Sequence, residues 1–592
     1  MVYRWLLILT LCFAAPLFGA ENNATAEVEM PTHIIHFSGE KVFDESALLD
    51  AVSAEHKSFY QFWKDDTARI KDKLIPTLDE TLRSFFDSEG YYDAEYKIKV
   101  TKTDVNISVR ENEPVRVGDI NISSDYDISP LITFHKGDIF RAKAFIGIKS
   151  NIVDTMLKEG YCSYDLDTKA YVDLDKHIAN IKYVLKKGGV CTFGNVTVKG
   201  LKTIDEDIVK SRVRAREGER FNLDLVKDSY DSLYALNAFD SVLIGVDRKF
   251  YNVVPVDIVV TEKAQPYHLE VGAGYDSYVG ARVHGQVIKH NFMGQAQQLQ
   301  LDLSWSQLEQ VAILSFFKPV IWEPFGFYLD FGARGGYSNL GYDGFWEKKA
   351  FFRTYLSHIS NKLEIKAGLA IESIDITERD DEKQKLPPEG YNLFLLTYPY
   401  LDVIYDGRDS KLNPKYGYYF RGYGEWGIPT DSETSDYLKF LLEARGIYTV
   451  ADLTMAVVGK VGVIKMGDEE NNRGIPESKK FFAGGMYSNR AYGFREIGVI
   501  TSPTTDLTDG ALTWANLSAE ADYPVWGDLY AAVFSDNTML TKDSGDFSGD
   551  IISTAGVGVR YMTPVGPFKL DVGFNVQDPS IYGIQFQIGQ SF

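Results

Sequence analysis

The second half of the chain is built from segments in which apolar and polar residues alternate. The pattern is clearest in four segments, at residues 268–275, 298–305, 568–575 and 582–592. A period of two places successive side chains on opposite faces of a β-strand. One face of these strands is apolar, while the other carries ionised groups, which a bilayer rejects unless they face water. The pattern therefore predicts an all-β transmembrane barrel over residues 266–592.

The length of this half sets the expected number of strands. At about 20 residues for a strand and its share of a loop, it accommodates roughly 16 antiparallel strands, within the known range of such barrels. Its last segment, Tyr582–Phe592, ends in an aromatic residue and resembles the closing strand of an outer-membrane barrel. A soluble β-sandwich is the alternative, but one of this length would need charged residues on its inward faces.

The sequence pattern of the first half predicts three copies of one α+β unit, at residues 31–111, 112–187 and 188–264. Each copy is expected to run strand, helix, helix, strand, strand, because two helices can cover one face of a three-stranded sheet. Shared small–aromatic pairs and opening-strand glycines mark the copies, at Gly90-Tyr91, Gly160-Tyr161, Ala238-Phe239, Gly39, Gly118 and Gly194. An insertion in the first copy, Ser53–Leu74, is expected to lengthen its helical part. One irregular α+β domain is the alternative for the whole half.

The first twenty residues have the composition of an export signal. A basic residue, Arg4, is followed by an apolar run up to Phe18 and by small residues up to Ala20. This order predicts a secretory signal peptide over residues 1–20, cleaved near Ala20. A membrane anchor is the alternative, but the run is short for a bilayer span. Aromatic residues make up 14% of the chain, which suits the interfacial girdles of a barrel.

The charge of the chain argues against one class of partner. The formal net charge is −21, so no surplus of cations exists to neutralise the phosphates of nucleic acid. One basic run, from Lys210 to Arg220, is expected to form a solvated helix face and the turn after it. Contact with lipid headgroups is the alternative for this run.

Two cysteines remain after the signal segment, Cys162 and Cys191. In an exported protein such a pair forms a disulfide or stays as two buried thiols, and both interpretations are open. The chain has no CxxC motif and no clustered histidines, so no metal site is predicted. No G-x-S-x-G motif precedes a helix, and neither catalytic residues nor a cofactor are predicted.

Four motifs of the second half resemble those of the Omp85 superfamily, whose members fold or export other proteins at the outer membrane. They are the hairpin Asp406-Gly-Arg408-Asp409 with Asn413-Pro414 and Gly417, the loop Phe481–Phe494, Phe534-Ser-Asp536, and the turn Met562–Pro567. The three α+β units resemble the polypeptide-transport-associated (POTRA) domains of that superfamily. Together the resemblances cover nearly all of the chain after the signal segment. They imply a barrel in the bacterial outer membrane, with POTRA domains in the periplasm.

The resemblance also implies roles for particular residues. In the superfamily the loop folds back into the lumen, and its arginine pairs with an aspartate of the facing strand. Carried over here, the pair is Arg490 and Asp536, with Phe534 packing on the guanidinium. The loop motif is Arg490, Ala491, Tyr492, Gly493 and Phe494. Ala491 and Thr538 stand where the family has glycine, and because Ala491 would be strained at a positive φ, the loop is expected to bend at Gly493.

A lateral gate follows from the same resemblance. The first and last barrel strands close the ring, and both carry glycines that weaken strand pairing and favour local twist. The expected gate residues are Gly272, Gly274, Gly583, Gly589 and Phe592. An open seam exposes a template edge to which an incoming client strand can add, and the edge strands of POTRA domains bind extended chains in the same way.

The number of POTRA copies distinguishes branches of the superfamily. Three copies resemble the TamA branch, which acts with TamB, a long β-rich protein anchored in the inner membrane. That branch assembles autotransporters and other outer-membrane proteins, and it is also implicated in phospholipid transport. The expected partners are therefore a TamB-like protein, unfolded outer-membrane clients and outer-membrane lipid. The alternatives are a BamA-type barrel assembly protein, which five copies would suggest, and a two-partner secretion pore.

Overall fold

The structure is a computed structural model. It describes residues 31–40, 42–56, 67–246, 252–276, 280–324, 327–342, 344–360, 362–379, 392–431, 434–467, 474–502, 507–563 and 567–588. The expected signal segment 1–20, the gate residues Gly589 and Phe592, and the centre of the Met562–Pro567 turn lie outside this range. Among the described residues no helix is long and apolar enough to cross a membrane. The chain forms two compact units, the first ending at Thr192 and including Arg220–Leu223, and the second holding the remainder.

The first sheet of the first unit has the strand order β2-β1-β4-β3, and β1 runs parallel to β4. Its elements are β1 (Thr32–Glu40), α1 (Glu45–Ala51), β2 (Arg69–Lys71), the 3-10 helix η1 (Asp72–Thr77), α2 (Leu78–Glu89), β3 (Glu95–Val100) and β4 (Asp104–Arg110). Helix α2 buries Leu78, Leu82 and Phe86, which are spaced four residues apart and therefore share one face. They pack with the alternating buried residues of β4 into one core.

The second sheet of this unit has the order β5-β7-β6, again with the opening strand parallel to the closing one. Its elements are β5 (Arg116–Ser124), the 3-10 helix η2 (Ser129–Leu131), α3 (Ala142–Lys158), β6 (Asp165–Asp173) and β7 (Ile178–Lys186). The first of its two expected helices is only the three-residue turn η2. Helix α3 covers the sheet alone over 17 residues.

Residues 57–66 of the insertion in the first copy lie outside the described residues, so the prediction that it lengthens the helical part is only partly tested. Beyond residue 66 the insertion forms the strand β2 and the start of the 3-10 helix η1. Strand β2 pairs with the start of β1, from Thr32 to Ile34. The insertion therefore covers part of the outer edge of β1, an edge that would otherwise offer unpaired backbone groups.

Cys162 and Cys191 are joined by a disulfide in the first unit. Their Cα atoms are 5.9 Å apart, an ordinary separation for such a bond. Cys162 follows the turn after α3, and Cys191 directly precedes the third sheet. The structure thus favours the disulfide over two buried thiols.

The third sheet belongs to the second unit and has the order β8-β10-β9. Its elements are β8 (Thr192–Lys199), α4 (Glu206–Ser211), α5 (Leu223–Ala235), β9 (Phe239–Val246) and β10 (Val253–Glu262). Glu262 closes the loop after β8 by accepting hydrogen bonds from the Thr203 hydroxyl and three backbone N–H groups. Burial alone would raise the pKa of Glu262, but these hydrogen bonds outweigh burial and lower it.

The three opening-strand glycines do not mark one repeat position, so that prediction is wrong. Gly39 lies at the end of β1 with a φ of 112°, and its counterpart in the third sheet is Gly200, with a φ of 93°. A Cβ at either position would lie 2.1 or 2.0 Å from a carbonyl oxygen of the central strand. Gly118 and Gly194 instead lie near the beginnings of β5 and β8.

The centre of the basic run is buried against the barrel, contrary to the solvated helix face that was expected. Arg212 donates a hydrogen bond to Asp330 at 2.6 Å, and both side chains are nearly inaccessible, at 4% and 1% exposure. The guanidinium carbon of Arg212 lies 3.9 Å from the centre of the Tyr328 ring. Arg214 donates to the Tyr328 hydroxyl at 2.9 Å. These contacts fix the third sheet to one end of the barrel.

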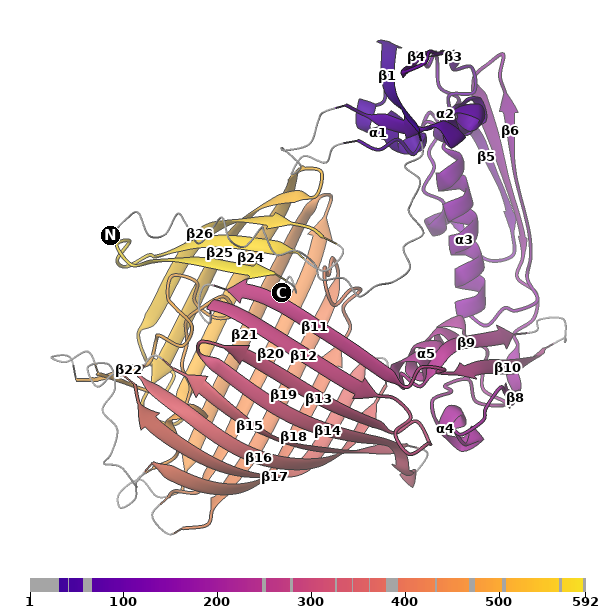
Figure 1. The fold of residues 1–592 in the computed structure, drawn as a ribbon. Helices are drawn as coiled ribbons and strands as arrows, with labels where there is room; N and C mark the ends of the chain where they lie inside the picture. The colour runs from indigo at the N-terminus through magenta and orange to yellow at the C-terminus, as the bar shows by residue number, and fades with distance from the viewer. Residues whose placement is uncertain are drawn as a thin grey trace. The chain divides into compact units, whose positions relative to one another are not determined.

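The barrel of the second unit is one sheet of 16 antiparallel strands, which confirms the expected number. Figure 1 shows these strands side by side. The strands are β11 (Tyr267–Asp276), β12 (Gly280–Lys289), β13 (Gln298–Ser306), β14 (Glu309–Trp322), β15 (Leu329–Gly341), β16 (Phe345–Ile359), β17 (Leu363–Glu378), β18 (Leu393–Asp406), β19 (Gly417–Pro429), β20 (Tyr437–Val450), β21 (Leu453–Met466), β24 (Thr513–Trp526), β25 (Leu529–Thr541), β26 (Ile551–Tyr561), β27 (Phe568–Asn575) and β28 (Tyr582–Ile588). Their outward side chains are exposed and apolar, as in Leu269, Leu442 and Val557. The sheet therefore turns its apolar face outward.

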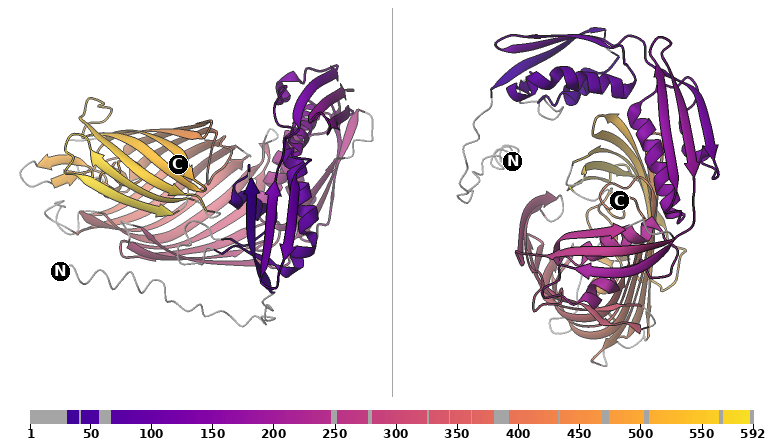
Figure 2. Two further views of the ribbon diagram at one scale, coloured as in Figure 1. Left: turned by 90° about the horizontal axis from the view of Figure 1, so that it is seen from above. Right: turned by 90° about the vertical axis from the view of Figure 1, so that its right-hand side faces the viewer.

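The two ends of the sheet meet at a seam between β11 and β28. Figure 2 shows the sheet curling round so that its last strands approach its first. The two strands lie side by side, but no backbone hydrogen-bonded pair joins their described residues. Strands near the seam are also shorter. Strands β27 and β13, whose ends both lie within the described residues, have 8 and 9 residues, whereas β17 has 16. The wall of the barrel is therefore lower on the side of the seam.

Candidate functional site

The loop between β21 and β24 folds back against the inner wall of the barrel. Its described residues form the 3-10 helix η4 (Glu477–Lys479) and the short strands β22 (Val499–Ser502) and β23 (Leu507–Asp509). Gly484 and Gly485 reverse the chain with φ values of 113° and 84°. A side chain on Gly484 would lie 2.1 Å from the carbonyl oxygen of Gly493. Paired backbone hydrogen bonds between Ala483 and Ile497 then close the segment that carries the predicted motif.

Arg490 forms the centre of the site. Its Nε and Nη2 donate to the two carboxylate oxygens of Asp536 at 2.9 Å each, and its backbone N–H donates to the same carboxylate at 3.1 Å. Both side chains are buried, and the guanidinium carbon lies 3.4 Å from the centre of the Phe534 ring. The structure thus brings together the three residues that the motif predicted. A two-pronged ion pair out of water holds the loop to β25.

Sequence reasoning missed the other charges around Arg490. The Nη1 of Arg490 also contacts Glu520 of β24 and Asp571 of β27. Arg560 of β26 bridges the same two carboxylates from the other side, and Lys569 lies 3.8 Å from Glu520. The loop is therefore held by a buried network drawn from four strands. The available signal was the alternation of β24 and β27, which turns these charges inward.

Glycines on the last strands make room for the loop backbone. A Cβ on Gly573 would lie 2.9 Å from the carbonyl carbon of Arg490, and one on Gly583 would lie 2.5 Å from its carbonyl oxygen. A Cβ on Gly556 would lie 2.2 Å from the Phe534 ring. Gly583 was predicted as a gate residue that weakens pairing, and the structure places it directly beneath the loop. Its part in a gate stays a prediction.

The prediction that the loop bends at Gly493 is wrong. Among the described loop residues, those with positive φ are Gly474, Gly484, Gly485 and Arg495, and neither Ala491 nor Gly493 belongs to them. Because the φ of Ala491 is not positive, alanine is accommodated there without backbone strain. The chain reverses earlier because the backbone hydrogen bonds that close the segment begin at Ala483.

The remaining motif residues lie along the path of the loop. Asn575 donates to the hydroxyl of Tyr492, which ties the loop to β27. Phe494 lies further out, at 37% exposure, with the Arg495 guanidinium carbon 5.1 Å from its ring centre. Thr538, at the second departure from the family pattern, is fully buried and its hydroxyl accepts a hydrogen bond from Asn516.

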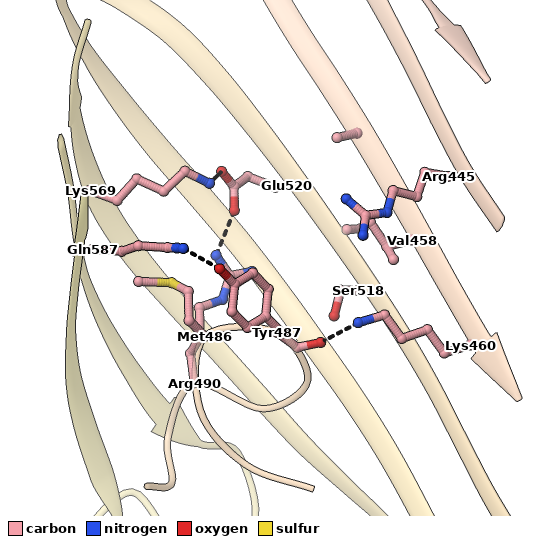
Figure 3. A pocket seen from close by; sticks show the side chains of 12 residues that line it. Arg445, Val458, Lys460, Met486, Tyr487, Arg490, Ser518, Glu520, Lys569 and Gln587 are labelled. Carbon is pink, nitrogen blue, oxygen red and sulfur yellow. Dashed lines mark hydrogen bonds and ion pairs between the residues drawn. The ribbon is translucent and has the colours of Figure 1, made fainter. Parts of the chain in front are cut away.

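The last strand contacts the loop through its inward polar face (Figure 3). Gln585 donates to the backbone carbonyl of Tyr492 at 2.9 Å. Figure 3 shows Gln587, which donates to the hydroxyl of Tyr487. Lys460 of β21 donates to the backbone carbonyl of Tyr487 at 2.8 Å. Gln587, Tyr487 and Lys460 help to line a cavity of about 60 Å³ between the loop and the wall. The loop therefore holds β28 from the inside of the barrel.

A second cation anchors the loop to strands on another part of the inner wall, and no sequence motif pointed to it. Lys479 of η4 lies 2.8 Å from Glu372 of β17 and 3.4 Å from Glu425 of β19. Its Nζ lies 4.3 Å from the centre of the Tyr398 ring, and Tyr437 donates to Glu425 at 2.8 Å. All of these side chains are buried. The loop is thus held at two points on different strands.

The hairpin motif at β18 and β19 is structural. Arg408 donates two hydrogen bonds of 2.9 Å to Asp406, and Asp409 accepts one from the backbone of Lys415. Gly417 has a φ of 127°, and a Cβ there would lie 2.5 Å from the carbonyl oxygen of Gly407. The motif therefore fixes a tight turn at the end of the barrel that bears the third sheet.

The predicted gate glycines of the first strand have local partners on β12. A Cβ on Gly272 would lie 2.0 Å from the ring of His284, so the glycine leaves space for that imidazole. Gly274 lies opposite Arg282 in the strand register. Neither observation tests the gate itself. Gly589 and Phe592 lie outside the described residues.

The chemistry of the site is that of a mechanical anchor. Within the part of the chain that the structure describes, no group of three or more His, Cys, Asp and Glu is placed to hold a metal ion. The arrangement supplies fixed charges and hydrogen bonds between a loop and the strands around it. Removing one member of a buried ion pair leaves the charge of its partner unmatched. The free energy of unfolding is then expected to fall by about 3–5 kcal/mol. The site can therefore set the position of the loop and of the last strand.

Known proteins share this architecture. Outer membrane protein assembly factor BamA of Nitratidesulfovibrio vulgaris is 21% identical over 572 residues, covering 92% of this chain and 70% of that protein. BamA of Neisseria meningitidis serogroup B is 22% identical over 651 residues, covering 94% of this chain and 78% of that protein. The crystal structure of Haemophilus ducreyi BamA lacking POTRA domains 1–3 covers 81% of this chain and 100% of that one, with a TM-score of 0.52 and 16% identity. That likeness shows the fold.

A family model gives the assignment. The model for the Omp85 superfamily domain matches residues 291–592, which is more than half of the chain. The match includes 14 of the barrel strands, from β13 to β28, together with the loop of Arg490. The chain therefore belongs to the Omp85 superfamily.

Proposed function

We propose that this protein assembles client proteins into the outer membrane by admitting their strands at the seam between β11 and β28. The barrel resides in the outer membrane, with the α+β domains in the periplasm. The observation that carries the proposal is the seam, where no backbone pair joins the described residues of the two strands. Unpaired edges are templates for an incoming strand.

The low wall beside the seam supports the same role. A short apolar wall is matched by a locally thinner bilayer, which lowers the barrier to inserting a hairpin. Strands β27 and β13, on either side of the seam, have 8 and 9 residues, so the thinning would be confined to this side. The loop network at Arg490 would then set how far β28 can move, because Gln585 and Gly583 lie against it.

The periplasmic sheets would receive the client first. Strand β3 is the outer edge of the first sheet, and a pocket of about 520 Å³ lies beside it. Tyr91, Tyr92 and Tyr96 line the pocket together with Arg83. An extended chain can add to such an edge through its backbone, and aromatic side chains can take up its residues with little regard to sequence.

The branch of the superfamily is the finer part of the proposal. Three small sheets support a TamA-type protein that acts with a TamB-like inner-membrane partner and has a part in phospholipid transport. The named relatives are BamA proteins, so a BamA-type role is equally supported. A pull-down from envelope extract with the full-length protein separates the two. A large inner-membrane protein in the eluate favours the TamA type, and a set of lipoproteins favours the BamA type.

A secretion pore is the alternative in which the client crosses the lumen. The loop anchored at Lys479 and Arg490 lies inside the barrel, which favours insertion at the wall over passage through the centre. Single-channel recording distinguishes the two functions. A mostly closed, flickering conductance supports the insertase, whereas a steady large conductance supports the pore.

The gate is tested by locking it. Cysteine pairs placed across the seam, one at Leu269, Val271 or Ala273 and the other at Ile584 or Phe586, would cross-link β11 to β28 on oxidation. We expect the cross-linked protein to lose assembly of a radiolabelled outer-membrane client into liposomes, and reductant to restore it. The control pair is Leu301→Cys with Leu314→Cys, which lie directly opposite each other on β13 and β14. Full assembly by the locked seam would contradict the proposal.

A further inference from the structure

A groove of about 1100 Å³ crosses the outward face of the barrel, away from the seam. It runs over β19, β20, β21, β24, β25 and β26. Its floor consists of residues with little or no side chain, Gly422, Ala444, Gly459 and Ala515. Ala444 and Gly459 are direct neighbours in the strand register. Small residues on successive strands therefore leave a valley in a wall that is otherwise covered by large side chains.

Large apolar residues form the sides of this groove. Phe420, Leu442, Val461 and Leu517 line it and are between 39% and 62% exposed. They share the outward parity of the floor residues, because the polar residues between them point into the lumen. Arg421, for example, pairs with Asp402 on the inner face. The outward side chains of the groove are therefore mainly apolar, and the groove is open to the hydrocarbon that surrounds the barrel.

The height that the groove spans along the membrane normal matches the thickness of one leaflet of a bilayer. The groove follows the hydrogen-bonding direction across six strands, and five gaps of about 4.8 Å give about 24 Å. Because strands of such barrels tilt by about 40°, this direction climbs about 15 Å, half of a hydrocarbon core of about 30 Å. It ends at the rim opposite the third sheet, at Phe547 and the beginning of β26.

The end of the groove at that rim is polar but uncharged. Asn537 and Ser553 lie opposite each other on β25 and β26, and the Ser553 hydroxyl donates to Asn537 at 2.8 Å. Gln577 also lines this end and accepts a hydrogen bond from the backbone of Ser553. The side chains of Asn537 and Ser553 point outward, whereas those of the adjacent pair Asp536 and Thr554 are buried inward. A ligand that fits this end carries neutral hydrogen-bonding groups.

We propose that this groove binds one acyl chain of an ester-linked lipid of the surrounding leaflet, with the ester region of the lipid at Asn537 and Ser553. The chain would descend one leaflet along the small-residue floor, and the ester carbonyls would accept hydrogen bonds at the neutral polar end. A client strand does not suit the groove, because every strand beneath it is already paired on both sides. The bound lipid would stay on the outer wall of the barrel, away from the seam between β11 and β28.

Filling the floor tests the acyl-chain contact. The full-length protein is purified in detergent and titrated with palmitoyl-oleoyl phosphatidylethanolamine, and native mass spectrometry counts bound lipids. In the variant Ala444→Leu with Ala515→Leu, we expect the tightest lipid to bind about tenfold more weakly, because two added side chains displace the acyl chain from its closest contacts. The control is Ala531→Leu, a small-to-large change on the outward face of β25 outside the groove. Heat-dependent gel migration checks that each barrel is folded.

Changing the polar end tests the ester contact separately. Asn537→Leu keeps a similar volume but removes the amide, and we expect about threefold weaker lipid binding, since one hydrogen bond in an apolar environment has an effect of this size. Equal lipid binding by the wild type and the filled-floor variant would overturn the proposal. Retention of a second polypeptide in place of a lipid, lost in the filled-floor variant, would also overturn it.

Discussion

The loop inside the barrel is held at two points that use different chemistry. At one, Arg490 donates hydrogen bonds to Asp536 from two of its nitrogens. Its third nitrogen forms ion pairs with two further carboxylates. At the other, Lys479 places a single ammonium between Glu372 and Glu425. The first anchor binds the strands next to the seam, and the second binds strands far from it. The arginine anchor depends on geometry, whereas the lysine anchor depends on charge.

The neighbours of each cation sharpen this difference. Around Lys479, the carboxylates have other partners, because Arg353 contacts Glu372 and two tyrosine hydroxyls donate to Glu425. Around Arg490, Asp536 has only Arg490 as an ion-pair partner among the described residues. Loss of the lysine therefore leaves its acids partly satisfied, while loss of the arginine leaves Asp536 buried without its cation. We expect the two anchors to fail to different degrees.

Removal of the arginine is expected to have the largest effect. Arg490→Ala should lower the free energy of unfolding by about 3–5 kcal/mol, because a buried carboxylate loses its partner. Urea unfolding in detergent, followed by tryptophan fluorescence, measures the change. Asp536→Asn alone should also destabilise, and the double variant should lose less than the sum of the single changes. Additive losses would mean that the two residues do not act as a pair.

Replacement of each cation by the other tests geometry against charge. Arg490→Lys keeps the charge but loses the fork, and we expect a loss of about 2–3 kcal/mol in unfolding free energy. Lys479→Arg keeps the charge at a site without a two-pronged contact, and its cost should stay below about 1.5 kcal/mol. The same urea titration serves both. Equal losses for the two replacements would remove the distinction between the anchors.

Removal of the lysine should be milder than removal of the arginine. Lys479→Met keeps most of the side-chain volume, and we expect a loss of about 2 kcal/mol, since Glu372 and Glu425 retain hydrogen bonds from other groups. Limited proteolysis should show the η4 end of the loop cleaved while the Arg490 end stays protected. Cleavage at both ends together would indicate one anchor in place of two.

The smallest effect is expected from the glycine beneath the loop. Gly583→Ala puts a Cβ 2.5 Å from the Arg490 carbonyl oxygen, so the loop must shift. We expect the free energy of unfolding to fall by about 1 kcal/mol. The change should also shorten the lifetime of the loop on β28, measured by hydrogen exchange of the loop amides. The control is Gly446→Ala on β20, where a Cβ would meet no atom within 4 Å. A larger effect at Gly446 would show that the position beneath the loop is not special.

These predictions rest on features that the sequence revealed to different extents. The pairing of Arg490 with Asp536 followed from motifs, because the residue types and their order were diagnostic. Lys479 lies in a segment with no such signature, and its acids come from strands β17 and β19, about a hundred residues and about fifty residues earlier in the chain. Only the closure of the sheet places them around one ammonium. The reversal at Gly484, predicted at Gly493, was missed because backbone hydrogen bonds within the loop decide it.

The sequence by itself determined the strands, their two faces and their number, since the alternation of side chains is a local property with a period of two. It also determined the three α+β units through the helical and strand patterns within each. Only the tertiary structure decided that Arg212 is buried against Asp330, that Gly573 and Gly583 lie beneath the loop, and that small residues on separate strands align into a groove. The physical reason is register, because the contacts between strands depend on how distant segments align.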